Sequence, residues 1–101
     1  MKTTGEIIRE QREVKGLLLR EVAALLDIDV AILSKIERGE RKAKRDQISR
    51  LADILQLNKN NLLIQYLSEK IAYEIADDDL ANEVLKVAEE KVEYLKAHKQ
   101  K

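Results

Sequence analysis

The chain has 101 residues, no formal net charge and a charged-residue content of 38%. This length suits one domain with a modest core, and the hydrophobic content of 45% argues against intrinsic disorder. The sequence lacks cysteine, which excludes disulfides and thiolate zinc sites, and it has no apolar stretch of membrane-spanning length. Its first residues do not resemble a signal peptide, so we expect a cytoplasmic protein.

Composition and apolar spacing predict an all-α chain. Proline is absent, and the dominant residue types are good helix formers. A first helix is expected over residues 4–14, capped by Thr4 and ended by Gly16. A second helix is expected over residues 18–26, with its apolar side chains facing the core.

A tight turn at residues 27–29 leads into a third helix over residues 30–38. Asp29 is a suitable N-cap for this helix, and Gly39 is a suitable stop. Three more helices are expected over residues 45–55, from about Asn61 to residue 75 or 76, and from residues 77–79 to about Ala97. We interpret the three aspartates at 77–79 as compensating the dipole at a helix start, in preference to a metal site.

Positive charge is unevenly distributed along the chain. All seven arginines lie within the first 50 residues, and the second half carries its positive charge as lysine. Residues 35–45 contain six basic side chains. Because arginine is the preferred planar ligand for phosphate, this distribution predicts that the first half contacts nucleic acid.

Several segments between residues 8 and 55 form one recognisable pattern: Ile8-Arg9-Glu10-Gln11-Arg12, Gly16-Leu17, Val22-Ala23, Leu26, Ile28, Ser34-Lys35-Ile36-Glu37-Arg38-Gly39 and Leu51-Ala52-Asp53-Ile54-Leu55. Through them, residues 4–63 resemble the phage-repressor or Cro-type (Xre) helix-turn-helix family. The resemblance implies a five-helix repressor-like bundle over residues 1–63, binding to double-stranded DNA, and a homodimer on a palindromic operator. It leaves residues 64–101 unexplained, and we expect them to form a helical extension packed on the same domain.

The resemblance also implies an ion pair between Arg12 in the first helix and Glu37 near the end of the third. Such a pair would tie the recognition helix to the bundle. If it is partly buried, loss of one partner leaves an uncompensated charge, at a cost of about 3–5 kcal/mol. We therefore do not count Arg12 among the phosphate ligands.

The predicted recognition helix departs from the family pattern at its start. Val30 and Ala31 stand where polar residues often reach base edges. They could contact thymine methyl groups, leaving Ser34 and Lys35 for hydrogen bonds, or the apolar surface could meet a protein. We favour the first reading. At the start of the second helix, Leu19 replaces a frequent phosphate-binding glutamine, and Arg20 could substitute for it or be a solvated side chain.

The basic run directly after this helix is expected to contact the DNA backbone. A short charge run is usually only a solvated surface, but the position beside a recognition helix favours phosphate binding. If each subunit neutralises three or four phosphates, log affinity should fall with log salt at a slope of roughly −5 to −7. The predicted ligands are Arg38, Arg41, Lys42, Lys44 and Arg45.

The last predicted helix carries two apolar stripes. One has the alternating four- and three-residue spacing of a heptad seam and comprises Ala81, Leu85, Ala88, Val92 and Leu95. The other comprises Leu80, Val84, Val87 and Tyr94. We expect the first stripe to join two subunits, although both stripes could instead complete the core of one chain.

No pattern in the sequence predicts an enzyme, a cofactor or a metal site. Three interpretations remain. The first is a dimeric transcription regulator, either a repressor or a controller of a restriction-modification system. The second is an antitoxin-like protein that binds DNA with one half and a protein partner with the other. The third is a protein-interaction bundle with weak or no DNA binding.

Overall fold

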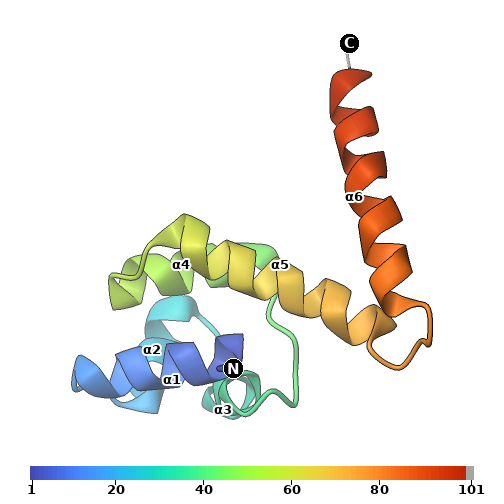
Figure 1. Ribbon diagram of the computed structural model, residues 1–101. Coiled ribbons are helices and arrows are strands. Elements are labelled where there is room, and N and C mark those ends of the chain that lie inside the picture. Colours follow the sequence, from blue (N-terminus) through green and yellow to red (C-terminus); the bar gives the residue numbers. More distant parts are fainter. Residues whose placement is uncertain (100–101) are drawn as a thin grey trace. The chain divides into compact units, whose positions relative to one another are not determined.

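The computed structural model describes residues 1–99, and this part of the chain is all-α (Figure 1). The helices found there are α1 (Thr4–Val14), α2 (Leu19–Leu26), α3 (Val30–Glu37), α4 (Arg45–Leu55), α5 (Lys59–Ile75) and α6 (Ala81–Ala97). The fold class expected from the sequence is therefore confirmed. None of the helices in residues 1–99 is both long and apolar enough to cross a membrane.

Helix α1 is capped by Thr3, so the prediction that Thr4 caps it was wrong. The Thr3 hydroxyl accepts a hydrogen bond from the Glu6 amide at 3.1 Å, and the Glu6 carboxylate accepts one from the Thr3 amide at 2.8 Å. This reciprocal capping box requires a glutamate three residues after the cap, which Thr3 has and Thr4 lacks. Thr4 is instead buried in the first turn of the helix.

The turns around α2 and α3 follow the sequence signals closely. The Asp29 carboxylate accepts a hydrogen bond from the Ala31 amide at 2.8 Å and so caps α3. Gly16 and Gly39 have φ angles of 69° and 77°, a left-handed conformation that glycine adopts without strain. The two glycines therefore end α1 and α3 as expected.

Two helix starts in the second half differ from the prediction. Helix α5 begins at Lys59, two residues early, because the Asn58 side chain accepts a hydrogen bond from the Asn61 amide and supports the first turn. Helix α6 begins at Ala81, after the aspartate run. The Asp78 carboxylate accepts from the Leu80 amide at 2.8 Å, so it stabilises the turn before the helix.

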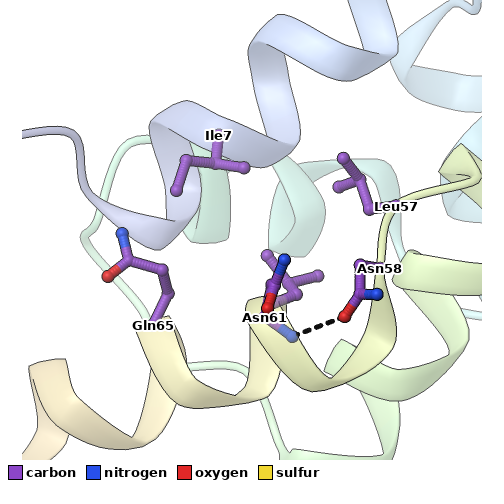
Figure 2. A pocket seen from close by; sticks show the side chains of 6 residues that line it. Ile7, Leu57, Asn58, Asn61 and Gln65 are labelled. Atoms are coloured by element: carbon purple, nitrogen blue, oxygen red, sulfur yellow. Dashed lines mark hydrogen bonds between the residues drawn. The ribbon is translucent and has the colours of Figure 1, made fainter.

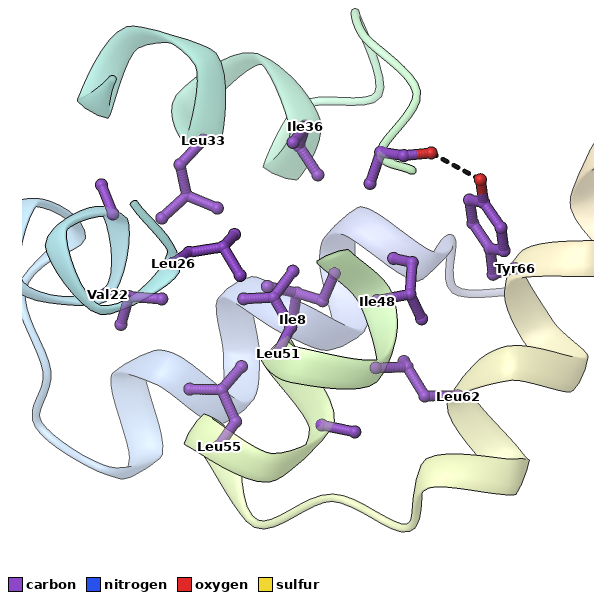
Figure 3. Close-up of a cluster of buried hydrophobic side chains, with 13 residues drawn as sticks. Ile8, Val22, Leu26, Leu33, Ile36, Ile48, Leu51, Leu55, Leu62 and Tyr66 are labelled. Atoms are coloured by element: carbon purple, nitrogen blue, oxygen red, sulfur yellow. Dashed lines mark hydrogen bonds between the residues drawn. The ribbon is translucent and has the colours of Figure 1, made fainter. Parts of the chain in front are cut away.

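Helices α1 to α4 and the first half of α5 enclose one apolar core (Figure 3). Figure 3 shows Ile8 of α1, Leu26 of α2 and Leu51 of α4 meeting at its centre. A close approach of α1 to α3 is needed to form it. A Cβ atom on Gly5 would lie only 2.5 Å from the carbonyl oxygens of Ile36 and Glu37, so this position requires glycine.

The chain divides into two compact units, Met1–Lys70 and Ile71–Lys101. The first unit extends beyond residue 63 because Tyr66 of α5 is buried in the core. The second unit contains α6, none of whose residues is buried. The two units are described separately below.

Candidate nucleic-acid interface

One face of helix α3 packs against the apolar core, and the opposite face is exposed to solvent. Leu33 and Ile36 are buried in the core. The opposite face carries Val30, which is 43% exposed, together with the exposed Ala31 and Lys35 and the partly exposed Ser34. These four residues, called the reading face below, were all predicted from the sequence. They combine two apolar contacts, one hydroxyl and one flexible cation, which is a set of groups able to meet base edges.

Arg12 and Glu37 form a bidentate ion pair beneath α3. Arg12 Nε lies 2.7 Å from Glu37 Oε2, and Arg12 Nη2 lies 3.0 Å from Glu37 Oε1. A third guanidinium nitrogen donates to the Leu17 carbonyl at 3.0 Å. The side chains of Arg12 and Glu37 are only 12% and 5% exposed. Because little water reaches them, the guanidinium and the carboxylate each need the other as a hydrogen-bond partner. The hydrogen bond to Glu37 raises the pKa of Arg12 above its ordinary value, although burial opposes this.

Ser34 and Arg38, predicted as separate DNA contacts, lie together. Arg38 Nη1 donates a hydrogen bond to Ser34 Oγ at 2.8 Å. The same guanidinium meets the Glu40 carboxylate at 3.0 and 3.2 Å. This hydrogen bond lowers the pKa of Glu40 below its usual range. Glu40 was not predicted to take part, and it competes with any anion that approaches Arg38.

The basic segment, residues 38–45, connects α3 to α4. It contains the five predicted phosphate ligands, all exposed: Arg38, Arg41, Lys42, Lys44 and Arg45. Between them Ala43 is buried, and its carbonyl accepts a hydrogen bond from the Tyr66 hydroxyl at 2.5 Å (Figure 3). This hydrogen bond anchors the middle of the basic segment to α5. The basic side chains on either side of Ala43 therefore project from an anchored backbone. No local pattern in the sequence indicates this support, because the two residues are far apart in the chain.

A shallow hollow lies between α1, α2 and α3. It has a volume of about 240 Å³ and is lined by Arg9, Arg12, Leu19, Ser34, Glu37 and Arg38. Arg20, the predicted substitute for a glutamine at position 19, is exposed on α2 and is not among these lining residues. Arg9 was not predicted as a functional residue.

A second hollow lies where α1 meets the start of α5 (Figure 2). Its volume of about 150 Å³ is below the roughly 300–1,000 Å³ of typical ligand pockets. Ile7, Leu57 and Leu62 supply apolar walls, while the amide side chains of Asn58, Asn61 and Gln65 surround them. None of these side chains titrates, so the hollow does not offer acid-base chemistry. Among residues 1–99, no cluster of potential ligands could hold a metal ion.

In the second unit, the predicted heptad seam lies on α6. Leu85, Val92 and Leu95 are between 46% and 64% exposed, Ala88 is exposed and Ala81 is partly exposed. The second stripe, Leu80, Val84, Val87 and Tyr94, is also exposed. The two stripes together make α6 an amphipathic helix with a wide apolar face.

Comparison with known proteins identifies the first unit. Residues 8–62, just over half of the chain, match the sequence pattern of the helix-turn-helix family. The chain belongs to the Xre/Cro-type helix-turn-helix family. Membership of this family indicates that residues 8–62 form a DNA-binding domain.

Relatives of this helix-turn-helix chain occur in Mycobacterium tuberculosis (strain ATCC 25618 / H37Rv). The chain is 33% identical over 61 residues to an uncharacterized HTH-type transcriptional regulator, covering 60% of the chain and 44% of the relative. It is 32% identical over 63 residues to the transcriptional regulator ClgR, covering 62% of the chain and 56% of the relative. The chain thus spans about half the length of these curated relatives. No solved structure gives a significant match.

Proposed function

We propose that this chain is a sequence-specific transcription regulator that binds double-stranded DNA with α3. One observation carries the proposal: the reading face of α3 is exposed directly beside the basic segment, and the buried Arg12–Glu37 pair holds the helix. In this arrangement α3 lies in the major groove, while the basic segment binds the flanking phosphates. The names of its relatives, which are transcriptional regulators, support the same role.

We propose further that the regulator acts as a homodimer on a palindromic operator. The support is the heptad seam of α6, since a self-complementary helix face closes most simply about a two-fold axis. Two recognition helices related in this way would sit about one DNA turn, roughly 34–36 Å, apart. A small dimer of this kind suits a repressor or a controller of a restriction-modification system.

The first experiment is the selection of bound duplexes from a random DNA pool. We expect an enriched motif with two inverted half-sites whose centres lie about 10 base pairs apart. A pool that remains random after selection would contradict sequence-specific binding. An enriched single half-site would contradict the homodimer but leave recognition by α3 in place.

A second candidate function is suggested by the apolar start of the reading face. Val30 and Ala31 are exposed side chains without hydrogen-bonding capacity, and Ile32 beside them is only partly buried. In an antitoxin-like or protein-interaction module, this surface or the α6 face would bind a protein partner. Co-purification of a second polypeptide from the source cells, together with weak and salt-insensitive DNA binding, would favour this function.

A further inference from the structure

The hollow between α1, α2 and α3 has an excess of positive charge in its walls. Three of its lining residues are arginines, and Glu37 is the acidic one. The Glu37 carboxylate already accepts two hydrogen bonds from Arg12, which satisfies both its oxygens. The charges of Arg9 and Arg38 are therefore those available to an anion that enters.

The ion pairs made by these two arginines are exposed and readily exchanged. Arg9 Nε lies 3.3 Å from Glu13, and Arg38 Nε lies 3.0 Å from Glu40. All four side chains are more than half exposed to solvent. Exposed pairs of this kind contribute little to stability, so an anion that binds both arginines can displace the two carboxylates.

Ser34 adds a neutral donor at the same place. Its oxygen accepts a hydrogen bond from Arg38 Nη1 at 2.8 Å, which orients the hydroxyl group. Within residues 1–99, the structure assigns the Ser34 hydroxyl proton no acceptor of its own. The hydroxyl can therefore donate to an oxygen atom placed in the hollow, as serine side chains do toward DNA phosphates.

We propose that this hollow binds one phosphate of the DNA backbone, held by Arg9 from α1, Ser34 from α3 and Arg38 from the basic segment. The proposal rests on the proposed DNA-binding function and adds Arg9 to its ligands. Leu19 lines the same hollow and offers no hydrogen-bonding side chain, so the contacts to the phosphate come from the two arginines and Ser34. Arg9 and Arg12 are three residues apart on α1 and line the same hollow.

The test compares Arg9→Gln with Arg50→Gln on the selected operator and on a scrambled duplex. Both arginines are exposed, and each substitution removes one positive charge. We expect Arg9→Gln to weaken binding to both duplexes about 10-fold and to lower the salt slope by about one per subunit. Arg50→Gln, at an arginine that does not line the hollow, should have a clearly smaller effect. Circular dichroism should show that both variants keep the wild-type helicity.

Single methylphosphonate substitutions along the operator give a second readout. One neutralised phosphate in each half-site should weaken the wild type more than Arg9→Gln, because the variant has already lost one of the three contacts to that phosphate. Glu13→Gln should tighten binding more than Glu10→Gln, an exposed glutamate on the same helix, because only Glu13 competes for Arg9.

Failure of this proposal can be separated from failure of DNA binding. If the wild type binds its operator specifically but Arg9→Gln binds equally well, with an unchanged salt slope, the phosphate site is wrong and the regulator stands. The same conclusion follows if the wild type and Arg9→Gln lose affinity to the same extent at every methylphosphonate position. If the wild type does not bind DNA specifically, the proposed function itself fails.

Discussion

The Tyr66 hydroxyl donates a hydrogen bond to the Ala43 carbonyl and so links α5 to the basic segment. Both residues are buried, and the ammonium of Lys70 lies 5.3 Å from the centre of the Tyr66 ring. Helix α5 thereby supports a backbone that we propose binds phosphates. The link explains why the first compact unit includes residues of α5 that follow the matched family region.

Tyr66→Phe should therefore affect both stability and DNA binding. The substitution leaves the buried Ala43 carbonyl without its partner, at a cost of about 1–3 kcal/mol in the free energy of unfolding. Binding to selected and scrambled duplexes should weaken alike, because a looser basic segment holds phosphates less well. Urea denaturation and fluorescence anisotropy measure the two effects. Tyr73→Phe, at a tyrosine that is 62% exposed, is the control and should change neither.

The Arg12–Glu37 pair should show strong coupling in a double-mutant cycle. Replacing either partner alone, by Arg12→Met or Glu37→Leu, leaves the other charge unpaired and almost completely buried. Each substitution should lower the free energy of unfolding by about 3–5 kcal/mol. The double variant should be more stable than either single variant, because no charge remains unpaired. Urea denaturation of the four proteins measures this coupling. Additive losses would show that the two residues act independently.

Lys35 should distinguish base sequences, whereas the basic segment should not. Lys35→Ala is expected to relax preference at one operator position and to cost about 1–3 kcal/mol of binding if the lysine contacts guanine. Arg41→Ala and Lys44→Ala should weaken all duplexes alike and reduce the salt slope. Competition binding with single-base operator variants measures the difference. Loss of discrimination in the Arg41 and Lys44 variants, with none in Lys35→Ala, would contradict the proposed reading face.

The seam on α6 should control assembly. Leu85→Glu combined with Val92→Glu places charges on this face and should convert dimers to monomers, with much weaker operator binding. The apolar core of the first unit does not include these residues, so most of the helicity should remain. Light scattering reports the mass. A wild type that stays monomeric at high concentration contradicts dimerisation, and a truncation before Asp77 that remains dimeric moves the interface to α5.

Local features of this chain could be predicted from sequence, because local spacing and capping determine them. The bounds of α1 and α4 and the Asp29 cap agree with the expectation. The Arg12–Glu37 geometry was anticipated only through the family resemblance. The seven-residue spacing of Tyr66 and Tyr73 predicts core or interface packing for both, but only Tyr66 is buried, and the chain divides after residue 70.

Contacts between segments far apart in the chain could not be predicted from the sequence. No role for Gly5 was predicted, yet α3 approaches it too closely for any side chain. The Glu69 carboxylate accepts a hydrogen bond from the Thr4 amide, 65 residues away in the chain. Arg9 lies beside Ser34 and Arg38 only because α1 and α3 pack together. Such contacts depend on tertiary packing, which residue spacing within one helix does not encode.

The central claim is that α3 recognises a DNA sequence while the basic segment binds phosphates. Fluorescence anisotropy on the selected operator and on a scrambled duplex, over a range of salt concentrations, tests it most directly. We predict that the operator binds at least about 1,000-fold more tightly. Affinity for both duplexes should fall as salt rises, with a slope near −5 to −7 for the dimer on its operator. Equal affinity for the two duplexes, or no binding at low salt, would contradict the account.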